Sequence, residues 1–390
     1  MLIFRLAARN LIRAGLKSWL NGIVLSISFL AIITTQALLK GMYEQTAESM
    51  IAAQIGGGQY WQNNYDPYDP LTFQDAHSRV PDALAELMHN NKAAAILILQ
   101  GTIYPEGRIR PVVIRGIDPD QRVLDLPTRA LGQNTEAIPV IIGHRMSKAT
   151  GLVPGDFFTL QWRDANGTFD ARDAVVSLVI ETSVQSIDIG QVWVPLQRLQ
   201  NLSEMRGEAT MLVLHKDLTD GPQFNDWFFK NRTYLLRDVT EMVRSKSIGS
   251  LVIYILLLGL ALLAIFDTQI FSIFRRRKEI GTLMALGLTR GCVIKLFTLE
   301  GAMQAGLGAL IGAAYGIPLL SLFAEKGWTL LETTDSYGFA LGEKLYPVFT
   351  LGIVLGTTVL VFMAATIVSY LPTRQIARLE PTEALRGRML

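Results

Sequence analysis

The chain has 390 residues, half of them hydrophobic, and a mean hydropathy of +0.29. This composition is too apolar for an ordinary soluble enzyme and too polar for a protein that lies wholly within a bilayer. The formal net charge of only +2 argues against a nucleic-acid-binding protein. A single cysteine, Cys292, rules out a disulfide framework within the chain and is interpreted as a small apolar helix residue.

The N-terminal segment predicts an amphipathic helix along the inner face of a membrane. Arg5, Arg9 and Arg13 repeat a cation every four residues, and apolar side chains supply most of the other side. Anchoring is the simpler role for this helix, and contact with a soluble subunit is the alternative. The apolar run that follows is long for a signal peptide and has no clear small-x-small cleavage site, so we expect it to be a retained span.

The region between the first and second apolar runs predicts a large mixed α/β domain. Its four histidines are scattered without ligand spacing, which argues against a zinc site. Asp164-Ala165-Asn166-Gly167 is a hairpin signal. Short apolar segments predict strands at residues 96–99, 112–117, 139–142, 157–162, 174–184, 192–195 and 210–215, and helices are expected at 144–150 and 196–202.

The segment Gly56–Tyr65 combines glycines with aromatic residues. It lacks the Lys-Ser/Thr pair and the preceding strand of a phosphate loop, so we expect a turn into an edge strand. Residues 42–53 and 240–247 are expected to continue the adjoining spans outward as helical stalks.

Four apolar runs approach the length of about 20 residues that a bilayer helix needs. Cations collect before the first run, between the second and third, and after the fourth, which predicts that both termini and the middle loop are cytoplasmic. Asp267 and Glu300 then lie at the cytoplasmic edge, and we expect them to bond neighbouring helices or lipid headgroups rather than to translocate an ion.

The third apolar run carries small residues at a spacing of four. Small side chains at this spacing allow helix backbones to approach closely. We expect packing within the subunit, with a seam toward a partner permease as the alternative. The predicted transmembrane packing residues are Gly301, Gly308, Gly312 and Gly316.

The sequence lacks recognisable catalytic motifs. It has no Gly-x-x-x-x-Gly-Lys-Ser/Thr loop, no Gly-x-Ser-x-Gly elbow and no hydrolase-like cluster of histidine and acidic residues. The predicted spans also lack the paired interior charges of a proton-coupled carrier. We therefore expect a non-enzymatic chain that binds no cofactor and draws its energy from another polypeptide.

Two separated motifs identify a resemblance. Residues 276–287, Arg-Arg-Lys-Glu-Ile-Gly-Thr-Leu-Met-Ala-Leu-Gly, resemble the R-x-x-E-I-G-x-L-x-A-L-G signature of FtsX/MacB-type (type VII) ABC permeases. Residues 370–386 are similar to the family's P-x-R-x-A-R-x-x-P-x-E-A-L-R tail, and Leu299-Glu300-Gly301 and Ala8-Arg9-Asn10-Leu11 match further family segments. Asp267 departs from the neutral polar residue that is common in relatives.

The resemblance implies a membrane protein with four transmembrane α-helices and a large mixed α/β periplasmic domain between the first and second. A multi-pass location in a bacterial inner membrane follows. The implied segments are a cytoplasmic amphipathic helix (1–18), spans at 19–40, 248–274, 296–323 and 346–371, a periplasmic domain with helical stalks (41–247), a cytoplasmic coupling helix (275–295), a short periplasmic loop (324–345) and a cytoplasmic tail (372–390).

The resemblance also implies an ATPase dimer that binds ATP and Mg²⁺ and docks on this chain and on a second permease, identical or homologous. A helix from about Glu279 to Gly291 would enter a groove on the ATPase. The implied coupling residues are Lys278, Glu279, Ile280, Gly281, Leu283, Met284, Leu286, Gly287 and Arg290.

The external domain is most similar to the lipoprotein-releasing permeases LolC and LolE, through residues 115–119 and 142–156. This similarity favours release of a lipid-anchored substrate, with a periplasmic carrier as a further partner. Two alternatives stay open. One is a MacB-like efflux permease that works with an adaptor, and the other is FtsX-like signalling to periplasmic hydrolases.

Overall fold

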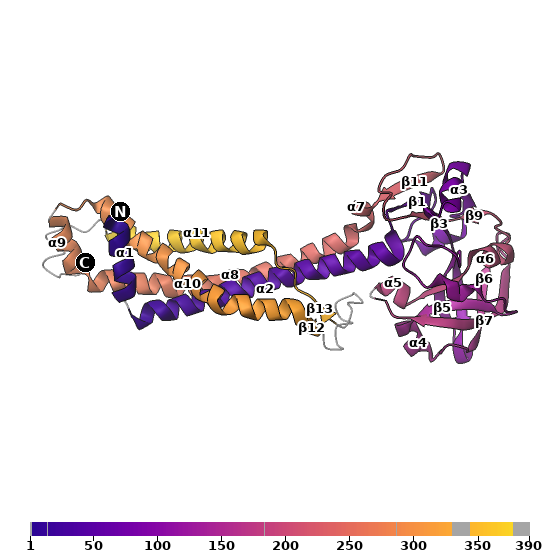
Figure 1. Cartoon of the computed structure of the whole chain (residues 1–390), viewed down its shortest axis with the longest axis horizontal. Coiled ribbons are helices and arrows are strands. Elements are labelled where there is room, and N and C mark those ends of the chain that lie inside the picture. Colours follow the sequence, from indigo (N-terminus) through magenta and orange to yellow (C-terminus); the bar gives the residue numbers. More distant parts are fainter. Residues whose placement is uncertain (1, 14, 183, 286, 330–343, 377–390) are drawn as a thin grey trace. The chain divides into compact units, whose positions relative to one another are not determined.

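The computed structural model describes residues 2–13, 15–182, 184–285, 287–329 and 344–376. The chain forms two compact units (Figure 1). Unit 1 comprises Met1–Met42, Val243–Trp328 and Leu345–Leu390, and unit 2 comprises Tyr43–Met242 and Thr329–Lys344. Most of the predicted loop 324–345 and the tail motif from residue 377 onward lie outside the described residues.

Unit 1 is a bundle of long helices. Within the described residues, four helices are long and apolar enough to cross a membrane, which agrees with the four predicted spans. Its described helices are α1 (Leu2–Arg13), α2 (Leu16–Met50), α8 (Arg237–Arg275), α9 (Arg277–Ala285), α10 (Arg290–Lys326) and α11 (Leu351–Ile376), of which α2 and α8 extend past the unit boundary.

The segments predicted as stalks are helical. The α2 helix runs to Met50 and continues as a π-helical turn, η1 (Ile51–Ile55). The α8 helix begins at Arg237, ahead of the predicted stalk at 240–247. Within unit 2, Ala47 and Ile55 pack against Leu236 and Val239, so the ends of these two helices share one small apolar core.

Small residues let α10 approach its neighbours closely. A Cβ atom added at Gly308 would lie 2.8 Å from Leu25 Cβ on α2, and one added at Gly316 would lie 2.5 Å from Leu30 Cδ1. At Gly301 it would lie 1.7 Å from the Ser369 hydroxyl oxygen on α11. Gly312 has more room, with Ser26 Cβ at 3.4 Å. The glycines at 308, 312 and 316 therefore face α2, whereas Gly301 faces α11.

Unit 2 is built on a nine-stranded mixed sheet, in keeping with the predicted α/β domain. The strand order is β11-β1-β10-β3-β4-β8-β5-β7-β6, and β3 also pairs with β6, so six of the strands close into a barrel. The strands are β1 (Gly58–Gln62), β3 (Ala93–Tyr104), β4 (Arg110–Ile117), β5 (Ile138–Gly143), β6 (Phe157–Arg163), β7 (Phe169–Ile180), β8 (Gln191–Pro195), β10 (Met211–Leu214) and β11 (Trp227–Asn231).

The long strand β3 joins the barrel to its three-stranded extension. Its first half pairs with β10, where Ile96 lies opposite Met211, and its second half pairs with β6, where Gly101 lies opposite Trp162. A Cβ atom at Gly101 would lie 2.4 Å from Ile114 Cδ1 and 2.8 Å from a backbone oxygen of β6. Glycine at this position therefore allows the barrel to close.

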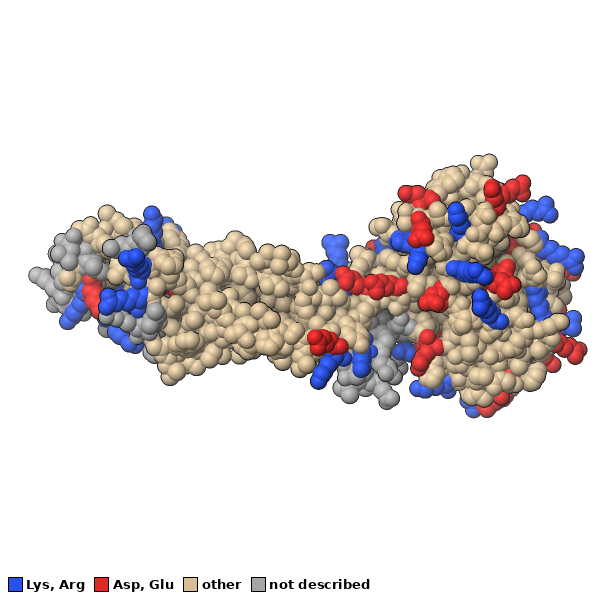
Figure 2. Space-filling model, in the orientation of Figure 1, with Lys and Arg blue, Asp and Glu red and all other residues tan. Residues whose placement is uncertain are grey.

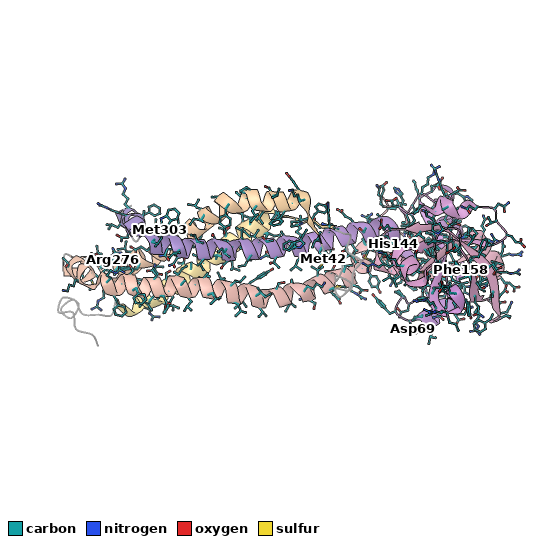
Figure 3. The ribbon with its side chains drawn as sticks, turned by 90° about the horizontal axis from the view of Figure 1, so that it is seen from below. Met42, Asp69, His144, Phe158, Arg276 and Met303 are labelled. Atoms are coloured by element: carbon teal, nitrogen blue, oxygen red, sulfur yellow. The ribbon has the colours of Figure 1, made fainter. Side chains whose placement is uncertain are left out.

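Apolar side chains on alternate strand positions build a core on each face of the sheet. Leu97 and Leu99 belong to one core with Trp162, and Ile96 and Ile98 belong to the other with Trp193. Phe158, labelled in Figure 3, is buried in the first of these cores. Short helices α3 (Asp82–His89), α4 (His144–Thr150), α6 (Leu196–Leu202) and α7 (Arg232–Leu235) complete the unit.

Several strand predictions need correction, and the strand expected at 96–99 runs from Ala93 to Tyr104. The strand expected at 174–184 runs from Phe169 to Ile180, because it pairs with β6 from the hairpin onward. The strand after Gly56 is not an edge strand, since β1 lies between β10 and β11. The edge strand β11 was not predicted, because its aromatic residues show no clear alternation.

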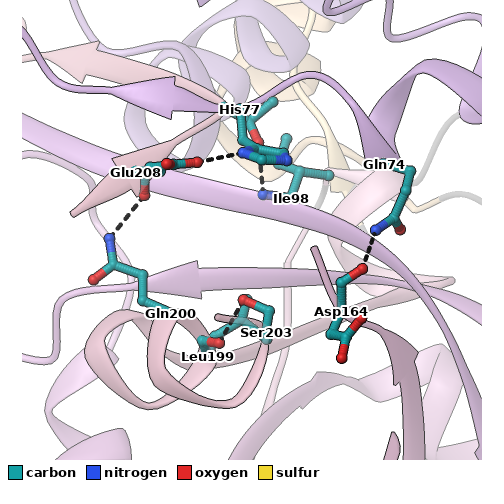
Figure 4. A network of polar contacts seen from close by, with 9 residues as sticks. Gln74, His77, Ile98, Asp164, Leu199, Gln200, Ser203 and Glu208 are labelled. Atoms are coloured by element: carbon teal, nitrogen blue, oxygen red, sulfur yellow. Dashed lines mark hydrogen bonds and ion pairs between the residues drawn. The ribbon is translucent and has the colours of Figure 1, made fainter. Parts of the chain in front are cut away.

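Side-chain bonds tie the loops of unit 2 to its strands (Figure 4). His77 contacts the carboxylate of Glu208, whose backbone oxygen accepts a bond of 2.7 Å from the Gln200 amide. The Gln74 amide donates to the backbone oxygen of Asp164 at 2.9 Å. Among the described residues, no group of three or more histidine, cysteine or acidic side chains is placed to hold a metal ion.

Candidate coupling site

One end of unit 1 carries a group of cations. Figure 2 shows few charged side chains along the middle of this unit and several lysines and arginines at the end where α1 and α9 lie. Arg5 and Arg9 of α1 are exposed there, as are Arg275 and Lys278 beside the start of α9. The predicted coupling segment thus lies at the basic end of the bundle.

The coupling segment is a short helix followed by a tight turn. The α9 helix ends at Ala285, and α10 begins at Arg290 after its N-cap residue Thr289. Gly287 has a φ of +97° and its N–H donates to the Met284 carbonyl at 3.1 Å. Because glycine reaches positive φ without strain, it ends the helix here. The single helix expected from about Glu279 to Gly291 is therefore wrong in its extent.

The inner side of α9 packs into an apolar cluster. Ile280 is 5% exposed and belongs to a core with Ile273 of α8 and Val293 and Phe297 of α10. Met284 packs against the same core, and Gly281 is also buried. This cluster fixes α9 to the two helices that flank it.

The remaining predicted coupling residues face outward or are not described. Lys278, Glu279, Gly287 and Arg290 are exposed. The backbone of Leu283 lies in α9 but its side chain is not described, and Leu286 lies outside the described residues. The exposed residues are the ones that a soluble partner could contact.

A buried carboxylate joins three elements at this end. Glu300 on α10 is 6% exposed and accepts a hydrogen bond of 2.5 Å from the Asn10 amide on α1. Arg276, labelled in Figure 3 between α8 and α9, donates a second bond at 3.0 Å. The expectation that Glu300 bonds neighbouring helices is confirmed. A buried charge is costly without such partners. The charge-assisted hydrogen bonds therefore fix the positions of Asn10, Arg276 and Glu300 relative to one another.

Arg276 also reaches the coupling helix itself. Its Nε atom lies 3.2 Å from the Glu279 carboxylate, and its guanidinium carbon lies 5.3 Å from the centre of the Phe297 ring. No role was predicted for Asn10 or Arg276, although both belong to the segments that carry the family resemblance. A search for polar partners of the buried Glu300 within these segments could have found them.

A polar hollow of about 520 Å³ adjoins this junction. Asn21 of α2 lines it and donates to the Thr268 hydroxyl of α8 at 2.7 Å. Asp267 also lines the hollow, is exposed, and makes no hydrogen bond or ion pair with the described part of the chain. Its expected partner, a headgroup or a neighbouring helix, is thus not among the described side chains.

Residues 251–381 match the family model described as FtsX-like permease C-terminal. This part of the chain is similar to the C-terminal part of FtsX-like permeases. The match covers most of α8, the whole of α9 and α10, and α11, so it contains Arg276 and Glu300 of the junction but not Asn10. This agrees with the resemblance carried by residues 276–287, and the four long apolar helices agree with a multi-pass membrane protein.

Curated relatives include both branches that the sequence suggested. The chain is 22% identical over 333 residues to the lipoprotein-releasing system transmembrane protein LolC of Neisseria meningitidis, covering 75% of this chain and 77% of LolC. It is 31% identical over 228 residues to the macrolide export ATP-binding/permease protein MacB of Hyphomonas neptunium, covering 58% of this chain and 32% of MacB. The chain thus spans about a third of the MacB relatives' length.

Among solved structures, the extracellular domain of the ABC-type transporter YknZ from Gram-positive bacteria is 13% identical. The comparison covers 47% of this chain and 94% of that domain at a TM-score of 0.26, which is too low to compare the folds.

Proposed function

We propose that this permease transmits the work of ATP hydrolysis from a separate ATPase to unit 2, and that this work releases a lipid-anchored protein from a bacterial inner membrane. The observation that carries the proposal is the junction at Glu300, where one buried carboxylate connects α1 and the start of α9 to α10. A push on α9 reaches a transmembrane helix through that junction.

The two sides of α9 have different roles in this mechanism. Exposed Lys278, Glu279 and Arg290 contact a groove on the ATPase dimer, which holds ATP and Mg²⁺. Buried Ile280 passes the displacement to α8 and α10, because a packed core moves as a unit rather than deforming continuously. We expect the ATPase, rather than this chain, to supply the catalytic groups for ATP hydrolysis, because the sequence has no phosphate-loop motif.

The orientation in the membrane follows from charge. The cationic end of unit 1, with Arg5, Arg9 and Lys278, lies in the cytoplasm under the positive-inside rule. The helices α1 and α9, which lie at this end, then face the ATPase. Unit 2 lies in the periplasm. A second permease, identical or homologous, completes the assembly.

Coverage of the relatives favours lipoprotein release as the task. The chain aligns with 77% of a LolC protein, whereas it aligns with only 32% of a MacB protein that also contains an ATP-binding part. Macrolide-type efflux with an adaptor is the second candidate, favoured by the 31% identity to MacB. Signalling to periplasmic hydrolases is the third.

Reconstitution tests this function. The permease is placed in vesicles with its ATPase and a fluorescent triacylated lipoprotein, and release to the outer solution is followed with ATP and with a non-hydrolysable analogue. We expect release only with hydrolysable ATP. If ATP hydrolysis is stimulated by the permease but the lipoprotein stays in the bilayer, the release function is wrong and the efflux candidate takes its place.

A further inference from the structure

A hollow lined by aromatic, amide and cationic side chains, and by one carboxylate, Asp66, lies beside β1 in unit 2. Its volume is about 380 Å³, which is the size of a small-ligand site. The proposed coupling mechanism does not use this hollow. The side chains that the argument needs are Trp61, Asn63, Asn64, Tyr68, Lys230 and Arg237.

Ring faces contact both cations of the hollow, and Arg237 also pairs with the Asp238 carboxylate at 3.8 Å. Lys230 Nζ lies 5.7 Å from the centre of the Trp61 ring and 4.6 Å from that of Tyr234, and Arg237 lies over the same tyrosine at 5.1 Å. Ring faces orient a cation without neutralising it. Lys230 forms no ion pair with any carboxylate in the described ranges, so its charge is available to a ligand.

Tyr68 supplies a fixed and open ring. Its side chain is 66% exposed, yet its hydroxyl donates to Asp238 and its backbone N–H donates to Asp66 at 2.9 Å. The hydrogen bond to Asp238 raises the pKa of the Tyr68 phenol, so the ring stays neutral at physiological pH. A platform that is already ordered loses little entropy when a ligand binds to it.

Two amides border this platform. Asn63 and Asn64 are exposed, and their side chains make no hydrogen bond within the described part of the chain. Each amide can both donate to and accept from a hydroxyl group. Hydroxyl-binding amides, an open ring and an unpaired cation therefore converge on one hollow.

We propose that this hollow binds an acidic saccharide. The C–H face of a sugar ring would lie on Tyr68, its hydroxyls would bond the amides of Asn63 and Asn64, and its carboxylate would meet Lys230. A simple anion would leave the ring and the amides unused, and a neutral sugar would leave the cation unused. The proposal is independent of the coupling mechanism and of the released substrate.

Binding of defined oligosaccharides to the full-length permease in detergent tests this proposal. The probe is trigalacturonate, with maltotriose as a neutral sugar of equal length and tricarballylate as a carboxylate without a sugar, each measured by titration calorimetry. We expect trigalacturonate to bind at least tenfold more tightly than either comparison compound. Absence of trigalacturonate binding, or equal binding of tricarballylate, overturns the proposal.

Substitutions in the hollow test where trigalacturonate binds. Lys230→Gln and Tyr68→Ala should each weaken its binding at least tenfold, whereas Lys148→Gln, at an exposed position of α4, should leave the affinity unchanged. Tyr68 is largely exposed, so its variant remains informative even if Lys230→Gln disturbs β11. Equal affinity of both variants and the native chain, with unchanged circular dichroism, overturns the assignment to this hollow.

Discussion

The guanidinium of Arg276 and the carboxylate of Glu300 meet at 3.0 Å and connect the turn before α9 to the membrane helix α10. Replacement of Glu300 by alanine would leave Arg276 and Asn10 without their acceptor. Because Arg276 stays partly solvated, we expect a loss of about 1–3 kcal/mol in the free energy of unfolding. Permease-stimulated ATP hydrolysis should fall with it.

Glu300→Gln is the control for this prediction, since it retains an acceptor oxygen without the charge. We expect the unfolding temperature of Glu300→Gln, and the rate of ATP hydrolysis that it stimulates, to be intermediate between those of the native chain and Glu300→Ala. Native-like behaviour of Glu300→Ala in both measurements would contradict a linking role for this carboxylate.

The α9 helix should depend on its single deeply buried isoleucine. Ile280→Ala removes buried methyl groups from the cluster with Ile273 and Phe297, at a cost of about 2–4 kcal/mol to local packing. We expect the ATPase to bind this variant but to be stimulated several-fold less. Thr282→Ala, on the exposed side of the same helix, should behave as the native chain in the same ATPase assay. An equal loss of ATPase stimulation in both variants would contradict a specific role for the buried Ile280 side chain.

Gly301 sets the distance between α10 and α11. In Gly301→Ala the new Cβ would lie 1.7 Å from the Ser369 hydroxyl and 2.4 Å from Ser369 Cβ, so the helices must shift. We expect a loss of about 1–3 kcal/mol in stability, measured as thermal unfolding of the purified chain. Gly356→Ala on α11 is the matched control, since nothing lies within 4 Å of its Cβ position. Equal unfolding temperatures of the two variants would show that the close contact between Gly301 and Ser369 does not limit stability.

Arg115 in unit 2 is a buried cation without matching partners. It is 6% exposed, lies 5.5 Å from the Trp193 ring centre, and its Nε and Nη1 atoms have no hydrogen-bond acceptor among the described residues. Burial lowers the pKa of the Arg115 guanidinium, because the charged form is favoured by water. Replacement by methionine, which has a similar length, should therefore raise stability by about 1–3 kcal/mol.

Urea unfolding of the full chain, followed by tryptophan fluorescence, tests the Arg115→Met prediction. Arg115→Ala provides the comparison, because it removes the same charge but leaves a cavity and should be less stable than the methionine variant. A large loss of stability in Arg115→Met would show that the guanidinium is satisfied in the native protein.

The sequence was most informative where a pattern is local. Long apolar runs predicted the four membrane helices, and short apolar runs placed strands such as β5 and β8 within a residue or two. The helices His144–Thr150 and Leu196–Leu202 also match their predicted bounds, because each follows a strand and begins with good helix formers.

Features set by contacts between distant segments were not predictable. The closure of the barrel depends on β3 pairing with β6, some sixty residues later, and no local pattern specifies that choice. The bond between Asn10 and Glu300 joins residues 290 positions apart. The end of α9 is set by a local feature, because Gly287, expected within the coupling helix, instead ends that helix.

In the proposed mechanism, ATP binding to the partner displaces α9 and thereby moves unit 2. Its most direct test is a distance measurement by electron paramagnetic resonance between spin labels at Thr282→Cys on α9 and Lys148→Cys in unit 2, in a Cys292→Ser background with the ATPase present. We predict that ATP with vanadate changes the distance distribution, and that Glu300→Ala abolishes the change while the ATPase stays bound. An unchanged distribution in the native complex, or an equal change in Glu300→Ala, would contradict the account.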